Sequence, residues 1–422
     1  MTKVVCCPEN LLPNSLDPEV FYFTTFRPSK RVNVGHMGLD LPHAVRSSNL
    51  APSVVAWDFA TFAFAVDAAD KTILRKTSSD GWTRMIDLNV SLVDPTPWTP
   101  LKGRLEQILG FLTGDFWTLT FEASNLVVPI ARRPLKRNAD CVCLLSGGAD
   151  SLVGAIDLTV GGRSPLFVSH IARGSGDAQS QFATRLGAID RHFKWSFSVK
   201  HNSTLEQSTR ARSIVFFAFA ALAASAVPAN LSGNVEIVVP ENGLISLNVP
   251  LGPGRIGSLS TKTTHPVYMS GIQEIWDTLH INAKLAFPYS DKTKGEMFHK
   301  CADQKLFVET VASSVSCGKY QRHGLTHCGE CVPCLIRRAA FRTAQLNDTT
   351  ERNYICSLLK YSQSKDVVAA ANACIRFQTQ GIHRFVGGAL SFASDHDKAM
   401  YEGVVSKGMM ELSVLLTEHG VL

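Results

Sequence analysis

The sequence lacks any apolar run long enough to cross a membrane. Its longest such stretch, 214–227, holds fourteen residues and is interrupted by Ser225, whereas a spanning helix needs about 20 apolar residues. The first residues also lack the apolar segment of a secretory signal. We therefore expect a protein that makes no membrane contact and works in the cytoplasm, with 214–227 as a buried core helix.

The sequence also lacks a large excess of one charge. It has 42 Lys and Arg and 36 Asp and Glu, which gives a net charge of +6. This weak positive balance suits a small anionic ligand such as ATP, and it argues against nucleic acid as the direct substrate. The eleven cysteines do not look like a disulfide framework in a chain of 422 residues. In a cytosolic protein, clustered cysteines bind metal or stay reduced.

No internal repeat or low-complexity segment divides the chain, but its pattern of elements predicts three parts. Residues 1–136 are expected to form an accessory α+β domain, with strands at 82–92 and 116–121 and helices at 54–69 and 101–112. The basic, proline-containing segment 131–137 is expected to be the linker. Residues 356–422 are expected to form a helical C-terminal extension without chemistry of its own, interrupted at Gly381, Gly387, Gly388 and Gly408.

Residues 137–355 alternate strand and helix. The expected strands are 141–145, 166–170, 195–199 and 235–239, and the expected helices are 151–160, 177–191 and 210–227. This alternation predicts an α/β fold with a parallel sheet covered by helices. Ligands bind such sheets at the carboxyl ends of the strands, and three loops reach that edge, those that include Ser146, Arg173 and Glu241.

The first of these loops carries the most information. It reads Ser146-Gly147-Gly148-Ala149-Asp150-Ser151, between an apolar strand and a helix. The two glycines permit a tight turn and a close approach to a ligand, and the free amides of the helix start attract a phosphate. The spacing matches neither the Walker A nor the dinucleotide-binding pattern. An ordinary turn with a serine cap is the alternative.

Four cysteines late in the chain have the spacing of metal ligands. They are Cys317, Cys328, Cys331 and Cys334, in a C-x10-C-x2-C-x2-C pattern. Four thiolates favour zinc, and a complete ligand set predicts a structural zinc site at 317–334. An iron–sulfur cluster also fits four cysteines, and His323 or His327 could replace one of them.

The loop at 146–151 resembles the pyrophosphate loop (PP-loop) of enzymes that cleave ATP between the α and β phosphates. Together with the later four-cysteine knuckle, it resembles the QueC family, the 7-cyano-7-deazaguanine synthases. The segments 287–296 and 334–341 also resemble that family, so the likeness covers about residues 140–354. The resemblance implies a parallel-sheet PP-loop core of the adenine nucleotide alpha hydrolase-like type, which uses ATP, Mg²⁺ and a structural Zn²⁺.

The chain departs from the housekeeping members of that family in its N-terminal domain, its tail and its segment 240–266. In these features it resembles the QueC-like proteins of bacterial anti-phage systems, QatC of the Qat system in particular. That resemblance implies an ATP-dependent ligase that adenylates a 7-deazaguanine carboxylate and couples it to an amine. The amine would belong to a partner protein of the same defence operon, which the N-terminal domain would dock.

Residue chemistry and the resemblance together suggest roles for individual side chains. We expect the phosphates to be bound by Ser146, Gly147, Gly148, Asp150 and Ser151. Asp150 would order the loop or bind Mg²⁺. Charge stabilisation falls to Arg173, Lys262 and Lys294, each of which could instead be a solvated basic side chain. Substrate contacts fall to Glu241, Asn242, Asn248, Arg255, Thr263 and His265. An Asn-Gly capping turn and a packed histidine are the alternatives for Asn242 and His265.

Other functions fit parts of the sequence. Ammonia as the amine would make the protein a 7-cyano-7-deazaguanine synthase. A tRNA-modifying PP-loop enzyme, such as a thiolase or a lysidine synthase, would need an active-site cysteine pair or a basic RNA surface. A non-catalytic scaffold that binds a nucleotide would need only the loop.

Overall fold

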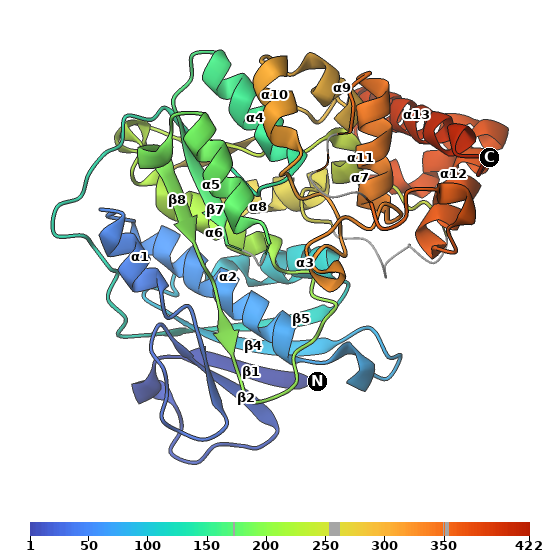
Figure 1. Cartoon of the computed structure of the whole chain (residues 1–422). Coiled ribbons are helices and arrows are strands. Elements are labelled where there is room, and N and C mark those ends of the chain that lie inside the picture. The colour runs from blue at the N-terminus through green and yellow to red at the C-terminus, as the bar shows by residue number, and fades with distance from the viewer. Residues whose placement is uncertain (172–173, 253–261, 349, 351–353) are drawn as a thin grey trace.

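The computed structural model describes residues 1–171, 174–252, 262–348, 350 and 354–422. Within these residues the fold is α/β and layered (Figure 1). Two sheets lie on either side of a double layer of helices, and a further group of helices covers the outer face of the second sheet. The C-terminal extension packs at the edge of this outer group.

The N-terminal sheet has six strands in the order β5-β4-β1-β2-β3-β9. Their bounds are β1 Thr2–Cys7, β2 Val20–Thr25, β3 Val34–Met37, β4 Met85–Leu92, β5 Phe116–Ala123 and β9 Val199–Lys200. Strands β1 to β5 are all parallel, and only β9 pairs antiparallel. The expected α+β organisation of this region is therefore wrong, because its own strands form a parallel sheet of the α/β kind.

The second sheet has the order β11-β10-β6-β7-β8, and every pair is parallel. Its strands are β6 Cys141–Leu144, β7 Pro165–His170, β8 His192–Trp195, β10 Val235–Val238 and β11 Ala283–Ala286. The chain runs from β6 outward to β8 on one side and then returns to place β10 on the other side. The strand order therefore reverses between β6 and β10, which is where open parallel sheets bind ligands.

Helices fill the layers around these sheets. The N-terminal part contributes α1 Leu41–Ser47, α2 Val54–Thr72 and α3 Lys102–Thr113. The second sheet carries α4 Ala149–Val160, α5 Gly176–Arg185, α6 Ser213–Ala224, α7 Gly243–Leu247, α8 Pro266–Thr278, α9 Lys294–Lys300, α10 Gln304–Val311 and α11 Val332–Thr343. The extension consists of α12 Lys365–Val386 and α13 Asp395–Glu418.

One hydrophobic core joins the N-terminal part to the second sheet. Helix α2 packs on β4 on one side and on α6 on the other, and it is apolar nearly all round, as a helix between two layers must be. Its buried Asp70 accepts hydrogen bonds from the amides of Arg210 and Ala211, at 2.6 and 2.7 Å, just before α6. Residues 1–136 and 137–355 thus share their core, and their division into separate domains stays a prediction.

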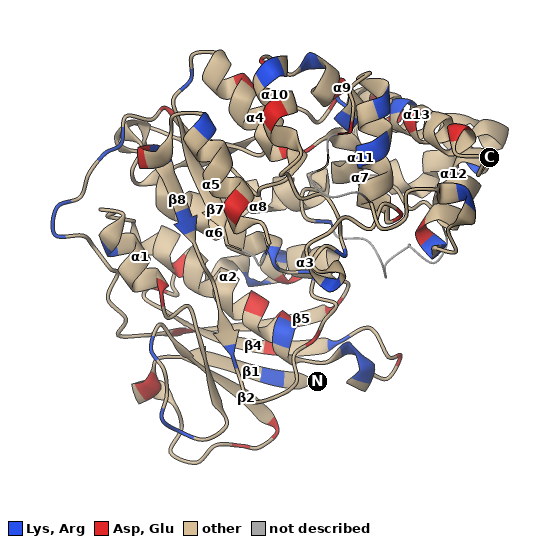
Figure 2. Ribbon diagram, in the orientation of Figure 1, with Lys and Arg blue, Asp and Glu red and all other residues tan. Residues whose placement is uncertain are grey.

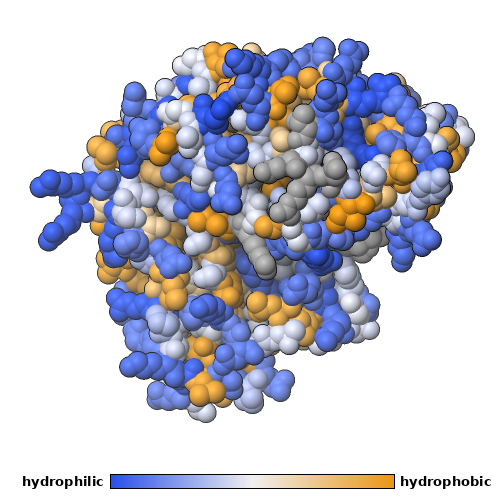
Figure 3. Space-filling model, viewed as in Figure 1, coloured by the Kyte–Doolittle hydropathy of each residue, from blue (hydrophilic) through white to orange (hydrophobic). Residues whose placement is uncertain are grey.

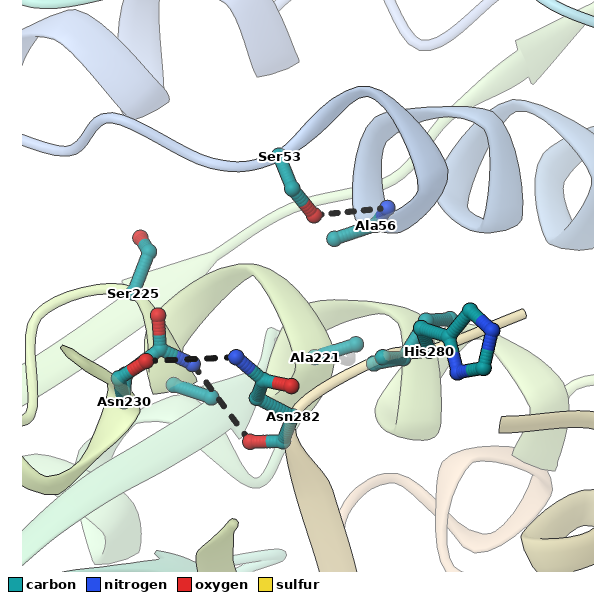
Figure 4. Close-up of a pocket in the computed structure, with 9 residues that line it drawn as sticks. Ser53, Ala56, Ala221, Ser225, Asn230, His280 and Asn282 are labelled. Carbon is teal, nitrogen blue, oxygen red and sulfur yellow. Dashed lines mark hydrogen bonds between the residues drawn. The ribbon is translucent and has the colours of Figure 1, made fainter. Parts of the chain in front are cut away.

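A cavity of about 60 Å³ remains between these layers (Figure 4). Ser53 accepts a hydrogen bond from the amide of Ala56 there, and Asn230 and Asn282 exchange two hydrogen bonds of 3.4 and 3.2 Å. The cavity is a packing gap at the layer interface.

Two sequence expectations fail within these elements. The expected strand at 195–199 is divided, because β8 ends at Trp195 and the chain then crosses to pair Val199 with Met37 in the other sheet. Gly408 does not interrupt a helix, since α13 continues through it. Gly381 does depart from helical geometry, with φ +73° inside α12, and Gly387 ends that helix.

The surface mixes charge and hydropathy. Along the ribbon in Figure 2, Lys and Arg and Asp and Glu are scattered over both halves of the view. The face in Figure 3 is mostly hydrophilic, with hydrophobic residues in small separate groups. Among the described residues, no helix combines the length and the apolar character that crossing a membrane requires.

Candidate functional site

The loop at 146–151 lies between β6 and α4, at the point where the strand order reverses. Its serines hold its shape. The Ser146 hydroxyl accepts a hydrogen bond from the Gly148 amide at 3.3 Å and donates one to the Ser151 hydroxyl at 3.2 Å, and Ser151 donates to the Gly148 carbonyl at 2.9 Å. The first amides of α4 have no partner inside a helix, so they are available to an anion.

Gly147 is required by the backbone. Its φ is +87°, and a Cβ there would lie 3.1 Å from the Ser175 carbonyl oxygen. Its own carbonyl accepts a hydrogen bond of 2.9 Å from the Val315 amide. The Gln179 amide then donates to the Ser146 carbonyl at 3.1 Å, so that neighbouring segments fix the loop from two sides.

Asp150, in the first turn of α4, is the centre of a buried polar group. Its side chain is 7 % exposed and forms an ion pair with Lys294, which is 8 % exposed. Asn242 donates a hydrogen bond of 2.7 Å to the other carboxylate oxygen. Burial raises the pKa of Asp150, but the Lys294 charge and the hydrogen bonds from Glu241, Lys294 and Asn242 outweigh it and lower the pKa below its usual value.

Glu241 lies against Asp150 and behaves as its neutral partner. Burial, followed by the nearby Asp150 charge and their hydrogen bond, raises the pKa of Glu241 well above its usual value. Contact between two carboxyl groups disfavours the ionisation of both, so the protonated form of Glu241 is favoured, and its hydroxyl can donate a hydrogen bond to Asp150. The loops after β6 and β10 therefore meet at Asp150, through Glu241 and the hydrogen bond from Asn242.

Asn242 is fully buried and caps the start of α7. Its side-chain oxygen accepts a hydrogen bond of 3.0 Å from the Ile245 amide, while its nitrogen binds Asp150. The capping alternative thus holds for this residue. A Cβ on Gly243 would lie 2.1 Å from the Ser290 carbonyl oxygen, which explains the glycine after the cap.

A capping box positions Lys294 at the start of α9. The sequence analysis used this segment only as part of the resemblance to the QueC family. Thr293 and Glu296 cap the start of α9 reciprocally. The Thr293 hydroxyl also donates a hydrogen bond to Glu411 of α13. Burial, together with the Glu296 charge, raises the pKa of Glu411 to about 7.

Helix α13 therefore supports the site, although the sequence suggested no role for it. It packs on α7, which Asn242 caps, and on α9, which begins at Lys294. A Cβ on Gly408 would lie 2.5 Å from the Leu244 side chain, so the glycine permits this close approach. The Thr-x-x-Glu pattern at 293–296 indicates the start of a helix in the sequence. No local sequence pattern indicates that Glu411 contacts Thr293.

Lys262 and His265, two further residues expected at the site, lie together beside Phe111. Lys262 lies 4.0 Å from the centre of the Phe111 ring, and His265 caps α8 with its ring between Phe111 and Phe392. Burial, together with Lys262, lowers the pKa of His265 to about 4, so it is neutral and packed. Within the described residues, no hydrogen bond or ion pair joins Lys262 or His265 to Asp150.

Four other residues were expected at the site. Arg173 and Arg255 lie outside the described residues. Asn248 ends α7 in a left-handed conformation, with φ +48°, and Thr263 is half-buried in the turn before α8.

The four expected cysteines come together. The Sγ atoms of Cys317, Cys328, Cys331 and Cys334 all lie within 4.8 Å of one another, and all four residues are buried. Two of the sulfur pairs are 3.9 Å apart, close to the ~3.8 Å across a tetrahedral site with Zn–S bonds of about 2.3 Å. The donor set fits zinc and could hold it as a closed structural site. His327 instead accepts a hydrogen bond of 3.2 Å from the Ser316 amide.

Part of the chain is similar to a known protein. Over 70 residues the chain is 37% identical to the 7-cyano-7-deazaguanine synthase of Methanocaldococcus jannaschii. The match covers 16% of this chain and 30% of that protein's length. No family model and no solved structure matches the chain. The similarity supports the resemblance to the QueC family and gives no support to the resemblance to proteins of the Qat system.

Proposed function

We propose that this chain is a QueC-like PP-loop ligase that uses ATP to adenylate a 7-deazaguanine carboxylate and then couples it to an amine. The observation that carries the proposal is the assembly of Asp150, Lys294 and Glu241 beside the loop at 146–151. A buried charge group of this kind, at the strand-order reversal of a parallel sheet, marks a site built for chemistry. The partial similarity to a 7-cyano-7-deazaguanine synthase supports the substrate class.

The chemistry proceeds in two balanced steps. An oxygen of the carboxylate bonds to the α-phosphorus of ATP, and the bond from that phosphorus to the bridging oxygen breaks, so that pyrophosphate leaves. The amine nitrogen then bonds to the acyl carbon, gives up a proton, and AMP leaves with the carboxylate oxygen. The amides at the start of α4 hold the phosphates, and Lys294 offsets the negative charge that develops during displacement.

Mg²⁺ accompanies ATP in this proposal and balances phosphate charge. Asp150 would offer the kind of carboxylate oxygen that Mg²⁺ prefers.

The identity of the amine follows from the proposed family relationship. A QueC-like protein of an anti-phage system would use the amine of a partner protein and stop at one amide bond. Intact-mass spectrometry of proteins co-expressed from the same operon tests this. The proposal expects a partner mass increase equal to a deazaguanine amide, which disappears with Asp150→Ala and persists with Asp177→Ala. Asp177 is the matched control because it is an exposed acidic residue in the first turn of the adjacent α5.

Nitrile synthesis from ammonia is the second candidate, because the partial relative carries that name. Ammonia-dependent formation of a nitrile, with no mass added to any partner, would favour it.

Thiol chemistry of the tRNA-modifying kind has less support. Burial raises the pKa of Cys141 to about 12 and that of Cys143 well above its usual value, so both thiols stay protonated inside β6.

A further inference from the structure

The two sheets have the same strand order. The second sheet places its strands β8-β7-β6-β10-β11, and the parallel part of the N-terminal sheet places β3-β2-β1-β4-β5. In both, the first strand is central, the next two lie on one side, and the last two lie on the other. The N-terminal sheet therefore has its own strand-order reversal, between β1 and β4, and its carboxyl edge is a second place where a parallel sheet binds ligands.

A large cavity lies at that edge. Its volume is about 870 Å³, and it is lined by residues that follow β1, β2, β3 and β5, including Glu9, Phe26, Arg27 and Arg46. Known small-molecule sites have volumes of about 300–1,000 Å³. Phe26 has φ +59°, a conformation that non-glycine residues adopt at a cost and that is frequent at ligand sites.

Two buried polar atoms of the lining have no hydrogen-bond partner among the described residues. They are Thr25 Oγ1, at the end of β2, and Trp57 Nε1, on α2. Their residues are 2 % and 1 % exposed, so bulk water does not satisfy these groups. Native proteins leave few such groups unpaired, and each one calls for an explanation. The Trp57 ring lies 4.5 Å from that of Phe26, so one aromatic pair forms part of the wall.

The charge of the cavity is positive. Arg27 and Arg46 are exposed and, within the described chain, neither side chain has a hydrogen bond or an ion pair. Glu9 is the acidic residue of the lining, and the Ser29 hydroxyl donates a hydrogen bond of 3.0 Å to its carboxylate. Two free guanidinium groups beside an aromatic pair suit a ligand with an anionic group and a planar ring.

We propose that this cavity is a second ligand site, separate from the loop at 146–151, for a small molecule that combines an anionic group with a planar ring. Arg27 and Arg46 would bind the anionic group, and Phe26 and Trp57 would contact the ring. Thr25 Oγ1 and Trp57 Nε1 would supply the hydrogen bonds that are unused in the free protein. The proposal concerns binding alone, so it does not depend on the ligase reaction.

Calorimetric titration of the full chain with GMP, and separately with inorganic phosphate, tests the proposal. We expect GMP to bind more tightly than phosphate, and the double variant Arg27→Ala/Arg46→Ala to weaken GMP binding about 100-fold. The matched control is Arg132→Ala/Arg133→Ala, which removes two exposed arginines of the segment after β5 and should leave binding unchanged. Asp150→Ala should keep this binding, which separates the result from any failure of the proposed function.

A conservative variant distinguishes ligand binding from a structural role. Thr25→Val removes an unpaired buried donor and nearly keeps the side-chain shape, so it should keep or raise the melting temperature while weakening GMP binding about fivefold. Unchanged GMP affinity in the arginine double variant, or no GMP binding by the wild type, would overturn the proposal. Phosphate binding as tight as that of GMP would overturn the assignment of a planar ring.

Discussion

Asn242 donates a hydrogen bond of 2.7 Å to the carboxylate of Asp150, although 92 residues separate the two in the sequence. This bond joins the loop after β6 to the loop after β10 across the strand-order reversal. Lys294 completes the group from a third segment, and α13 supports two of the three segments from behind. The site is thus an assembly of distant segments, and its contacts can be tested one at a time.

Lys294→Met should reduce ATP-dependent pyrophosphate release about 10²–10³-fold, because it removes the positive charge that faces the loop. Met keeps most of the apolar length of Lys, but Asp150 loses its buried ion-pair partner, so the variant is less stable and its rate is measured where it is still folded. Lys300→Met changes an exposed lysine in the last turn of the same helix and should leave the rate within about twofold. Steady-state kinetics of both variants provide the comparison, and equal rates would remove Lys294 from the mechanism.

Glu241→Gln should change how stability depends on pH. The pKa of Glu241 is raised in the folded protein, so its proton contributes stability that is complete below about pH 4.5 and declines as the pH rises toward the folded-state value. Glutamine cannot ionise and still offers a donor to Asp150. Between pH 5 and pH 8 the variant should therefore lose less stability than the wild type. Urea unfolding midpoints at the two pH values measure this, and identical losses would show that Glu241 is already ionised.

Gly408→Ala should destabilise the protein by about 1–3 kcal/mol, because a Cβ would lie 2.5 Å from the Leu244 side chain and force α13 and α7 apart. Gly403→Ala is the control in the same helix, where nothing lies within 4 Å of the added carbon. It should stabilise the protein by about 0.5–1 kcal/mol through higher helix propensity. Chemical denaturation distinguishes the two, and equal effects would mean that α13 does not fit closely on α7.

Cys328→Ser should abolish binding of one zinc per chain and lower the free energy of unfolding by about 4 kcal/mol or more, because a structural zinc contributes directly to folding. Cys356→Ser, at a half-buried cysteine outside the cluster, should retain the metal. Elemental analysis and thermal unfolding check both variants. Full zinc content in Cys328→Ser would contradict the assignment of that ligand.

The sequence predicted those parts of the site that are encoded locally. The loop at 146–151 and the cysteine knuckle each lie in one short segment, where spacing limits geometry. The strand-and-helix alternation likewise predicted the parallel sheet and the edge at which Glu241 would lie. Local patterns do not encode which distant segments meet, so the sequence did not indicate that Glu411 contacts Thr293 or that α13 covers α7.

The errors have similar physical causes. Residues 195–199 have the composition of one strand, and only tertiary pairing of Val199 with Met37 divides them between two sheets. The connection between β1 and β2 contains no α-helix, so the N-terminal sequence lacked the alternation that signals a parallel sheet. The sequence before Pro266 suggested a reactive histidine. His265 is instead buried by Phe111 and Phe392, which lie far from it in the chain.

The most direct test of adenylation follows an oxygen atom. The protein is given ATP, an amine donor and a 7-deazaguanine carboxylic acid labelled with ¹⁸O in its carboxylate, and the products are weighed by mass spectrometry. If the carboxylate attacks the α-phosphorus, one labelled oxygen appears in AMP and none in pyrophosphate, and Asp150→Ala abolishes the transfer while Asp177→Ala retains it. Label in inorganic phosphate, or AMP that carries no label, would contradict the proposed reaction.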